Sequence, residues 1–338
     1  MSQLLAQTAQ YLSHLPVTQL LQVRREGNPL RRYAHVSPFM GKLQPVDNLA
    51  LDGIVNTAIA ILPPLPGSTL VMGLAESSLL LAWWLARALP IANTDLSFTS
   101  RHSCFYANER SFLEPHSHAP THFFCLPASR SYTQIIIVDD ELTTGITVKH
   151  LIWALRDVTK HFYILTLSDL RSPEHKMQFD IACAEENLQI QLVDLSIYYP
   201  LPSPISRAAT VPNPPTVRTL TDLQLQQRWN LHKPDTFYMV GECIAPILNF
   251  WQSLPISSRP ALRHVTRSPW EIDQQVIFSR VCLTQGEVPY YLYNWDLPKP
   301  KRALIVNDKY TRASAIQLVE FLRENGITTD NIEVFVTC

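Results

Sequence analysis

Residues 135–147 read Ile135-Ile136-Ile137-Val138-Asp139-Asp140-Glu141-Leu142-Thr143-Thr144-Gly145-Ile146-Thr147. The first four residues are apolar and β-branched, which predicts a short, buried parallel strand. Two adjacent carboxylates follow where open α/β sheets place their ligands. A hydroxyl-rich turn with one glycine then leads into a helix predicted over residues 148–155. Such a turn offers backbone N–H groups and the positive end of the helix dipole to a phosphate.

The side chains of this stretch suit different parts of one ligand. The predicted phosphate turn consists of Thr143, Thr144, Gly145, Ile146 and Thr147. Asp139 and Asp140 would repel a phosphate, but carboxylates can hold ribose hydroxyls and an Mg²⁺ ion. The stretch therefore predicts a site for both ends of a ribose 5-phosphate.

This stretch resembles the phosphoribosyl-diphosphate (PRPP) signature of type I phosphoribosyltransferases: four apolar residues, two acids, two variable positions, then Thr-Thr-Gly-x-Thr. Glu141 departs from the pattern, since most members carry an aliphatic residue there, so we expect an extra carboxylate near the ribose or the metal. The resemblance implies an α/β fold with a parallel sheet and helices on both of its faces. It also implies Mg²⁺ as the cofactor, held by Asp139 and Asp140 largely through water.

Composition limits the classes of protein to consider. At 338 residues and 46% hydrophobic residues, the chain can build two domains with apolar cores. A net charge of −1 argues against binding to nucleic acid or to an anionic membrane. The charged fraction of 17% is low, so we expect a partner to cover part of the surface. The cysteines show no metal-ligand spacing and the most apolar run, residues 79–86, is too short to span a bilayer, so we expect a cytoplasmic protein.

A second strand, loop and helix are predicted at residues 68–88. The loop between them consists of Leu74, Ala75, Glu76 and Ser77. The resemblance assigns the pyrophosphate of PRPP to this loop and associates the loop with a strained peptide bond. The Glu76 carboxylate would repel pyrophosphate unless a metal bridges them, and capping of the following helix is the alternative role. Arg101 is a further candidate for the pyrophosphate, because guanidinium groups donate two hydrogen bonds to phosphate oxygens.

A long segment of weak periodicity, residues 112–119, lies between the pyrophosphate loop and the PRPP signature. The resemblance places a flexible loop here, and we predict a lid. Glu114, His116 and His118 are its candidates for acid–base chemistry on the leaving group or the base. A metal site is the alternative, although two histidines without further ligands are weak evidence for one.

Basic residues gather near the N-terminus, at Arg24, Arg25, Arg31, Arg32 and Lys42. The segment Asn28-Pro29-Leu30-Arg31-Arg32 could belong to a hood over the active site that holds an anionic substrate. The alternative for these basic residues is a solvated basic surface.

Prolines cluster between residues 199 and 217, which predicts a stiff, extended linker. We therefore predict a PRPP-binding domain over residues 1–200, a linker over 201–216 and a C-terminal domain over 217–338. The C-terminal part repeats the plan of the first, because Gly241 minus Gly73 and Asn307 minus Asp139 both give 168. Its copy of the signature is degenerate: Asn307 replaces the first acid and no glycine opens the turn, which reads Tyr310-Thr311-Arg312-Ala313. We expect a second, phosphoribosyltransferase-like α/β domain that has lost PRPP binding.

The combined motifs resemble one group of two-domain proteins. Val138 to Gly145, Glu114 to Ala119 and Thr266-Arg267-Ser268-Pro269 are similar to motifs of divergent phosphoribosyltransferases with a C-terminal TRSP domain, found in bacterial tellurite-resistance and stress gene clusters. The resemblance implies a role in the synthesis or salvage of a nucleotide-like metabolite. It also makes partner proteins of the same gene cluster, or a homodimer, the expected assemblies.

Two functions follow from these residues. The first is Mg²⁺-dependent phosphoribosyl transfer between PRPP and a nucleobase-like acceptor. The second is a non-catalytic PRPP or nucleotide sensor, which would keep the acid pair and the phosphate turn but would not need the acid–base residues of the lid. The identity of the base and the direction of the reaction are left open.

Overall fold

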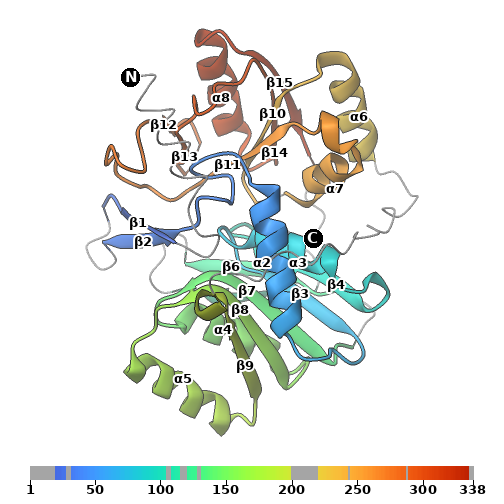
Figure 1. Cartoon of the computed structure of the whole chain (residues 1–338), viewed down its shortest axis with the longest axis vertical. Coiled ribbons are helices and arrows are strands. Elements are labelled where there is room, and N and C mark those ends of the chain that lie inside the picture. Colours follow the sequence, from blue (N-terminus) through green and yellow to red (C-terminus); the bar gives the residue numbers. More distant parts are fainter. Residues whose placement is uncertain are drawn as a thin grey trace. The chain divides into compact units, whose positions relative to one another are not determined.

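The computed structural model describes residues 20–27, 32–103, 108–114, 120–127, 131–198, 220–242, 244–286 and 288–334 (Figure 1). The contacts of the chain divide it into two compact units. The first unit is formed mainly by Leu49–Val211, and the second by Leu21–Asn48 together with Pro212–Thr337. Each unit is an α/β structure with its own sheet.

The first unit contains a parallel five-stranded sheet with the order β4-β3-β7-β8-β9. Its strands are β3 (Thr69–Gly73), β4 (Thr94–Phe98), β7 (Gln134–Leu142), β8 (His161–Asp169) and β9 (Gln189–Asp194). The chain adds β4 on one side of β3 and then returns to add β7, β8 and β9 on the other side. Right-handed crossovers then place helices on both faces, and the strand order reverses between β3 and β7.

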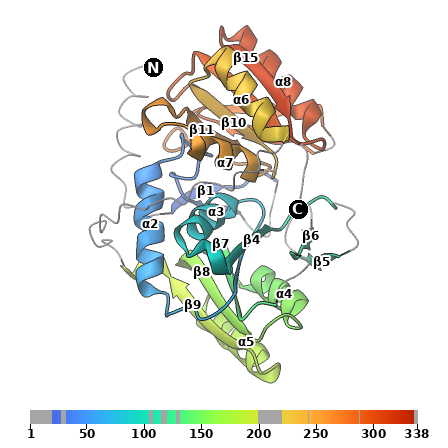
Figure 2. The same ribbon diagram turned by 90° about the vertical axis from the view of Figure 1, so that its right-hand side faces the viewer.

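Helices cover both faces of this sheet, as the sequence predicted (Figure 2). They are α2 (Asn48–Ile61), α3 (Leu79–Ala88), α4 (Ile146–Leu155) and α5 (Pro173–Glu185). The short turn η1 (Ile91–Asn93) precedes β4, and η2 (Leu195–Tyr198) follows β9. Alternate strand residues bury their side chains against α4 and α5, because successive strand residues point to opposite faces. The strand members of that cluster are Leu70, Met72, Ile135, Ile137, Phe162 and Ile164.

The strand that carries the acid pair is longer than predicted. β7 continues to Leu142, since Asp139 pairs with Thr166 and Glu141 with Ser168 of β8. The two acids therefore lie within the last residues of the strand and not after it. α4 begins at Ile146, two residues before the predicted start at residue 148, so the phosphate turn runs directly into the helix.

An antiparallel hairpin stands between β4 and β7 in the chain. It consists of β5 (Glu109–Leu113) and β6 (Thr121–Cys125). Ser100, just beyond β4, pairs with Phe123 of β6 and so attaches the hairpin to that end of the sheet. Part of the predicted lid segment is therefore strand: Phe112 and Leu113 belong to β5, while residues 115–119 lie outside the described residues.

The second unit repeats this plan. Its parallel sheet has the order β11-β10-β14-β15, which corresponds to β4-β3-β7-β8. The sheet strands are β10 (Thr236–Val240), β11 (Ala261–Val265), β14 (Arg302–Asn307) and β15 (Thr328–Glu333); the other elements of this half are α6 (Leu220–His232), α7 (Ala245–Ser253), η3 (Ile256–Ser258), β12 (Arg280–Leu283), β13 (Tyr290–Tyr293) and α8 (Arg312–Glu324). The β12–β13 hairpin stands between β11 and β14 and is attached through Thr266 and Tyr291. The predicted second α/β fold is therefore present, and its hairpin, which was not predicted, matches that of the first unit.

The segment Leu21–Asn48 packs in the second unit, although the predicted domain limit placed it in the first. Its strands β1 (Leu21–Arg24) and β2 (Tyr33–Val36) form an antiparallel pair. Leu21, Val23, Ala34, Val36 and Leu43 share one apolar cluster with Trp270, Ile277, Tyr291 and Tyr293. The division of the chain into units thus does not follow its order in sequence.

The predicted basic cluster near the N-terminus has several different environments. Arg24 lies 3.3 Å from Glu271, and the buried Lys42 ammonium lies 5.9 Å from the centre of the Trp270 ring. A solvated basic surface does not describe Lys42. Arg32 is exposed, and Arg31 lies outside the described residues. Within the described ranges, no helix combines the length and the apolar character needed to cross a bilayer.

Candidate functional site

The carboxyl ends of β3 and β7 bring the two predicted ligand loops together. Gly73 pairs with Val138, and the N–H of Leu74 donates to the carbonyl of Val138 at 3.3 Å. The predicted pyrophosphate loop, residues 74–77, therefore starts beside the acid pair that follows Val138. This is also where the strand order reverses, which is the position at which open α/β sheets bind ligands.

Backbone N–H groups hold the side chains of Asp139 and Asp140 in place. One oxygen of Asp139 accepts the N–H of Asp140 at 3.0 Å, and one oxygen of Asp140 accepts the N–H of Glu141 at 3.1 Å. Asp139 and Asp140 are half-buried, whereas Glu141 is 9% exposed. These contacts fix both carboxylates at the end of the strand.

The acid pair fits a metal that takes most of its ligands from elsewhere. Among the residues that the structure describes, no group of three or more His, Cys, Asp or Glu side chains could hold a metal ion. Mg²⁺ commonly binds through one or two carboxylates, with water and substrate phosphates as its other ligands. Asp139 and Asp140 match that donor set.

The phosphate turn has the geometry of an anion site. Gly145 has φ of +78°, a left-handed conformation that favours glycine, and it is the N-cap of α4. The hydroxyl of Thr144 accepts the N–H of Ile146 at 3.3 Å. The first N–H groups of a helix have no partner within the helix, so that of Thr147 lies where an anion would be stabilised.

A buried cation beneath this turn was not predicted from the sequence. Arg171, just after β8, donates through Nε to Asp169 at 2.8 Å and through a terminal nitrogen to the other oxygen at 3.1 Å. Lys176 lies 3.1 Å from the same carboxylate. Burial opposes ionisation of Asp169, but these hydrogen bonds lower its pKa below its usual range. A Cβ atom at Gly145 would lie 3.1 Å from Cδ of Arg171, so the Arg171 side chain lies against the phosphate turn.

The pyrophosphate loop is fixed mainly through its backbone. The buried hydroxyl of Ser78 accepts the N–H of Leu74 at 2.9 Å and donates to the carbonyl of Leu74 at 2.8 Å. The peptide bond between Ala75 and Glu76 is cis. The N-cap residue of α3 is Ser78, so Glu76 does not occupy the capping position that was its alternative role.

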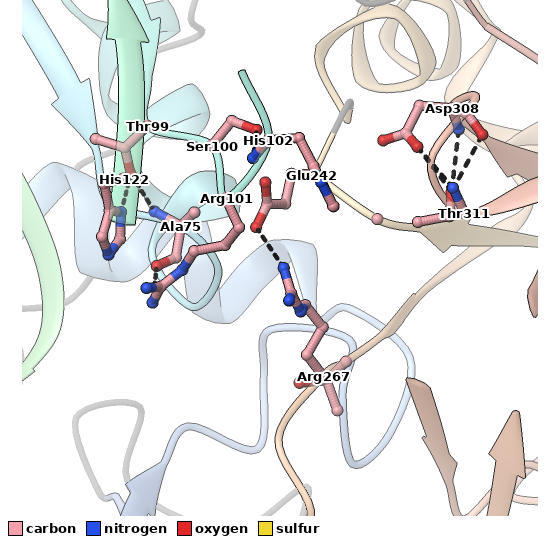
Figure 3. Close-up of polar contacts among 12 residues, drawn as sticks. Ala75, Thr99, Ser100, Arg101, His102, His122, Glu242, Arg267, Asp308 and Thr311 are labelled. Atoms are coloured by element: carbon pink, nitrogen blue, oxygen red, sulfur yellow. Dashed lines mark hydrogen bonds and ion pairs between the residues drawn. The ribbon is translucent and has the colours of Figure 1, made fainter. Parts of the chain in front are cut away.

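A closed ring of hydrogen bonds joins this loop to the β5–β6 hairpin; Figure 3 shows the part of it formed by Ala75, Thr99, His122 and Arg101. The N–H of Ala75 donates to Oγ1 of Thr99 at 2.8 Å, and Thr99 Oγ1 lies 2.9 Å from Nδ1 of His122. His122 Nε2 lies 3.0 Å from Oε2 of Glu114, which also accepts from Arg101. Arg101 closes the ring by donating to the carbonyl of Ala75 at 3.4 Å. Both polar backbone groups of Ala75 are therefore held by side chains.

These contacts bear on the predicted role of Glu114. Burial alone would raise its pKa, but the hydrogen bond from His122 and the positive charge of Arg101 lower the pKa from 4.5 to about 2. A carboxylate with this pKa is ionised at neutral pH and has no proton to donate. The structure therefore favours a positioning role for Glu114 over the predicted acid–base role. His116 and His118, the other predicted acid–base residues, lie outside the described residues.

The equivalent turn in the second unit contains a carboxyl group of its own, that of Asp308. α8 begins at Arg312, five residues after Asn307, whereas α4 begins at Ile146, seven residues after Asp139. The carboxyl group of Asp308 accepts the N–H of Tyr310 at 2.9 Å. It also accepts the N–H and the hydroxyl of Thr311, each at 3.0 Å (Figure 3). Burial raises the pKa of Asp308, and its side chain occupies the turn that a phosphate would enter. This geometry agrees with a degenerate copy.

Two arginines of the second unit that could bind an anion already face carboxylates. Arg267 of the Thr-Arg-Ser-Pro motif lies 4.0 Å from Glu242. Arg312 donates to both oxygens of Glu333, at 2.5 and 2.7 Å.

The match to a protein family covers more than half of the chain. A family model described as "Phosphoribosyl transferase" matches residues 20–197. No curated protein matches the sequence. Solved structures similar to this chain include adenine phosphoribosyltransferase from Rhodothermus marinus, with 14% identity, a TM-score of 0.38 and coverage of 55% of this chain and 97% of that chain. The enzyme from Trypanosoma brucei, in complex with AMP, pyrophosphate and ribose-5-phosphate, has 11% identity, a TM-score of 0.38 and coverage of 64% and 91%. On the strength of the family match over residues 20–197, the chain belongs to the phosphoribosyl transferase family.

Proposed function

We propose that the chain transfers ribose 5-phosphate between PRPP and a nucleobase-like acceptor, with Mg²⁺ as cofactor. The observation that carries this proposal is the junction of β3 and β7, where Leu74, the first residue of the fixed loop, donates to Val138, directly before the acid pair and the turn that follows it. Ribose hydroxyls, a 5-phosphate and a pyrophosphate need these three kinds of site. Family membership supports the reaction class.

Each part of the junction would act on one part of PRPP. Asp139 and Asp140 would hold the ribose hydroxyls and, through water, the metal. When bound, Mg²⁺ would neutralise the departing pyrophosphate. The turn from Thr143 to Thr147 would hold the 5-phosphate, and residues 74–77 would receive the pyrophosphate. Fixing the sugar between these sites favours a transition state with positive charge on the anomeric carbon.

Arg101 would act on the pyrophosphate indirectly. It holds the carbonyl of Ala75 and the carboxylate of Glu114, so its position in the loop is fixed by two acceptors. Proton transfer to the leaving group or the base is assigned to His116 and His118. His116→Ala and His118→Ala should lower kcat more than they lower PRPP affinity.

The sensor function remains the second candidate, because the commitment of Glu114 to Arg101 and His122 removes one predicted acid–base group. We also propose a cytoplasmic setting and a role in nucleotide-like metabolism linked to stress or tellurite resistance. The assembly would be a homodimer or a complex with proteins of the same gene cluster. These features rest on the resemblance of the sequence motifs.

The decisive experiment is a PRPP-dependent pyrophosphate-release assay with Mg²⁺ across nucleobases and related heterocycles. The matched control is Asp139→Asn with Asp140→Asn, because asparagine can still accept the N–H groups that the two aspartates hold. We expect release with at least one acceptor in the wild type and none in the folded double variant. PRPP binding by calorimetry without any release would favour the sensor, and equal binding by the double variant would contradict the site.

A further inference from the structure

The second unit contains a pocket that the proposed reaction does not use. It has a volume of about 550 Å³ and is lined by Trp229, Lys233, Asp235, Ser257, Arg259 and Arg302, among others. Ligand pockets for small molecules usually span about 300–1,000 Å³, so this one has room for a metabolite. β10, β11 and β14 begin at Thr236, Ala261 and Arg302, so the pocket lies at the amino ends of these strands. The degenerate turn at Asp308 lies at their carboxyl ends, so the two places are distinct.

The charge of the pocket favours an anion. Three cations line it, and Asp235 is the one acid among its lining residues. The Asp235 carboxylate is engaged by the backbone: it accepts the N–H of Lys301 at 3.0 Å and that of Arg302 at 3.3 Å, and it accepts the hydroxyl of Thr236 at 3.3 Å. The Asp235 carboxylate therefore stabilises the start of β14. The three cations outnumber this one acid, so the lining of the pocket keeps a net positive charge.

Two of the three cations are held in place before a ligand binds. Arg259 donates to the carbonyls of Leu254 at 3.1 Å and Gln252 at 2.7 Å, and its guanidinium lies 4.6 Å from the centre of the Trp251 ring. The ammonium of Lys233 lies 5.3 Å from the centre of the Trp229 ring. A cation that is already ordered loses less entropy on binding than a free surface side chain.

The remaining lining suits a phosphate group. The exposed hydroxyls of Ser257 and Ser258 stand on the short η3 turn beside Arg259 and can donate to phosphate oxygens. Pro234, Pro255 and Pro260 restrict the backbone of the walls. Arg302 is exposed at the start of β14 and adds a side chain that can donate two hydrogen bonds to one phosphate.

We propose that this pocket binds a phosphorylated small molecule of about the size of a nucleoside or sugar monophosphate. The site is separate from the junction in the first unit and does not depend on the proposed transfer reaction.

Hydrogen-exchange mass spectrometry on the full chain, with AMP as the probe and adenosine as the neutral control, tests the proposal. We expect AMP to protect peptides that cover residues 229–236 and 255–261, and adenosine to leave them unchanged. Binding at the first unit would protect other peptides, so the two sites are distinguished. Absence of protection in these peptides, or equal protection by adenosine, would overturn the proposal.

Substitutions then identify the cations. Arg302→Glu and Lys233→Glu should each raise the AMP concentration needed for half-maximal protection about tenfold, since a charge-assisted hydrogen bond contributes that much to affinity. Lys301→Glu is the matched control, because Lys301 is the exposed neighbour of Arg302 and does not line the pocket. An equal effect of Lys301→Glu and Arg302→Glu would mean that AMP is attracted only by the general positive charge of this surface, and it would contradict binding in the pocket. Arg302→Gln should show an intermediate loss.

Discussion

Nε2 of the fully buried His122 lies 3.0 Å from Oε2 of Glu114. The other ring nitrogen of His122 lies 2.9 Å from Thr99, whose Oγ1 accepts the N–H of Ala75. Because an ionised carboxylate can only accept, Nε2 of His122 must carry a proton. One imidazole thus connects the β5–β6 hairpin to the loop that we assign to pyrophosphate, and the position of that loop depends on the hairpin.

The stability of the protein should depend on Glu114 and on pH. Its pKa is lowered to about 2 in the folded chain, so its contribution is fully present above about pH 4.5 and is lost as the pH falls through 2. The size of that shift corresponds to roughly 3 kcal/mol in the free energy of unfolding. Glu114→Gln should therefore destabilise the protein at pH 7, and the difference from the wild type should shrink between pH 5 and pH 2.

Urea unfolding of both proteins across this pH range measures the difference. Glu174→Gln, at an exposed position in the first turn of α5, is the control and should change the free energy of unfolding little. A difference between Glu114→Gln and the wild type that stays constant with pH would contradict an ionised Glu114 in the ring.

Thr99 should affect binding of the pyrophosphate of PRPP and not binding of its ribose 5-phosphate part. Thr99→Val removes the acceptor for the N–H of Ala75 and the partner of His122, so the pyrophosphate loop loses its support. We expect PRPP affinity to fall about tenfold, which corresponds to roughly one lost hydrogen bond to the loop. Affinity for ribose 5-phosphate, which has no pyrophosphate, should not change. Calorimetry with both ligands checks this, and Thr99→Ser should restore PRPP binding; equal losses for both ligands would assign Thr99 to general stability.

The local features of the site could be predicted from the sequence because each is written in consecutive residues. The strand, the acid pair and the glycine turn occupy residues 135–147 and keep that order in the structure. Thr99 and His122 are 23 residues apart and meet only because of the hairpin's attachment at Ser100 and Phe123. No pattern in consecutive residues encodes such a contact.

Arg171 and the β1–β2 pair show the same limit. The contact between Arg171 and Gly145 depends on how the loop after β8 folds over the turn after β7. The packing of Leu21 and Val23 against Trp270 joins residues about 250 positions apart. The proline-rich linker indicates a boundary in the sequence, but it does not indicate that residues before it pack with residues after it. The internal repeat, in contrast, could be predicted, because two copies of one pattern at a constant offset are visible in the sequence itself.

Gly145→Ala should damage both the fold and the phosphate site. Alanine is strained at φ of +78°, and its Cβ would also lie 3.1 Å from Arg171 and 3.3 Å from Phe179. Gly326 is the matched control, since it has the same φ of +78° but no atom within 4 Å of an added Cβ. Gly326→Ala should cost about 1 kcal/mol of stability from the backbone alone, and Gly145→Ala should cost more. Thermal unfolding compares the two variants. Equal losses of stability would mean that the Arg171 side chain moves away from the added Cβ without a cost in free energy.

Gly145→Ala should in addition weaken ribose 5-phosphate binding, whereas Gly326→Ala should not. Calorimetry measures both. Unchanged affinity for ribose 5-phosphate in a folded Gly145→Ala protein would mean that this turn does not bind the phosphate.

A fragment that ends at Ser203 should be poorly soluble. It keeps β1 and β2 but lacks Trp270, Ile277, Tyr291 and Tyr293, against which those strands bury their apolar side chains. A fragment over residues 49–203 lacks the two strands as well and is the matched comparison. We expect the longer fragment to aggregate or to bind a hydrophobic dye more strongly than the shorter one, as measured by sedimentation and dye fluorescence. The reverse order would mean that β1 and β2 do not need the second unit.

The turn at Asp308 should not bind PRPP, because the carboxyl group of Asp308 already fills it. Asp308 accepts hydrogen bonds from both Tyr310 and Thr311, so a phosphate would have to displace a buried carboxylate that the backbone stabilises. Calorimetry with Mg²⁺ should therefore give one PRPP per chain, falling to none when Asp139 and Asp140 become asparagine. Asn307→Ala should leave both stoichiometry and affinity unchanged, whereas Asp308→Ala should cost about 2 kcal/mol of stability by leaving N–H groups without an acceptor. One PRPP still bound by the Asp139→Asn, Asp140→Asn protein after Arg302→Glu is added, which disables the pocket at the amino ends of β10 and β14, would show that the second turn is a working site.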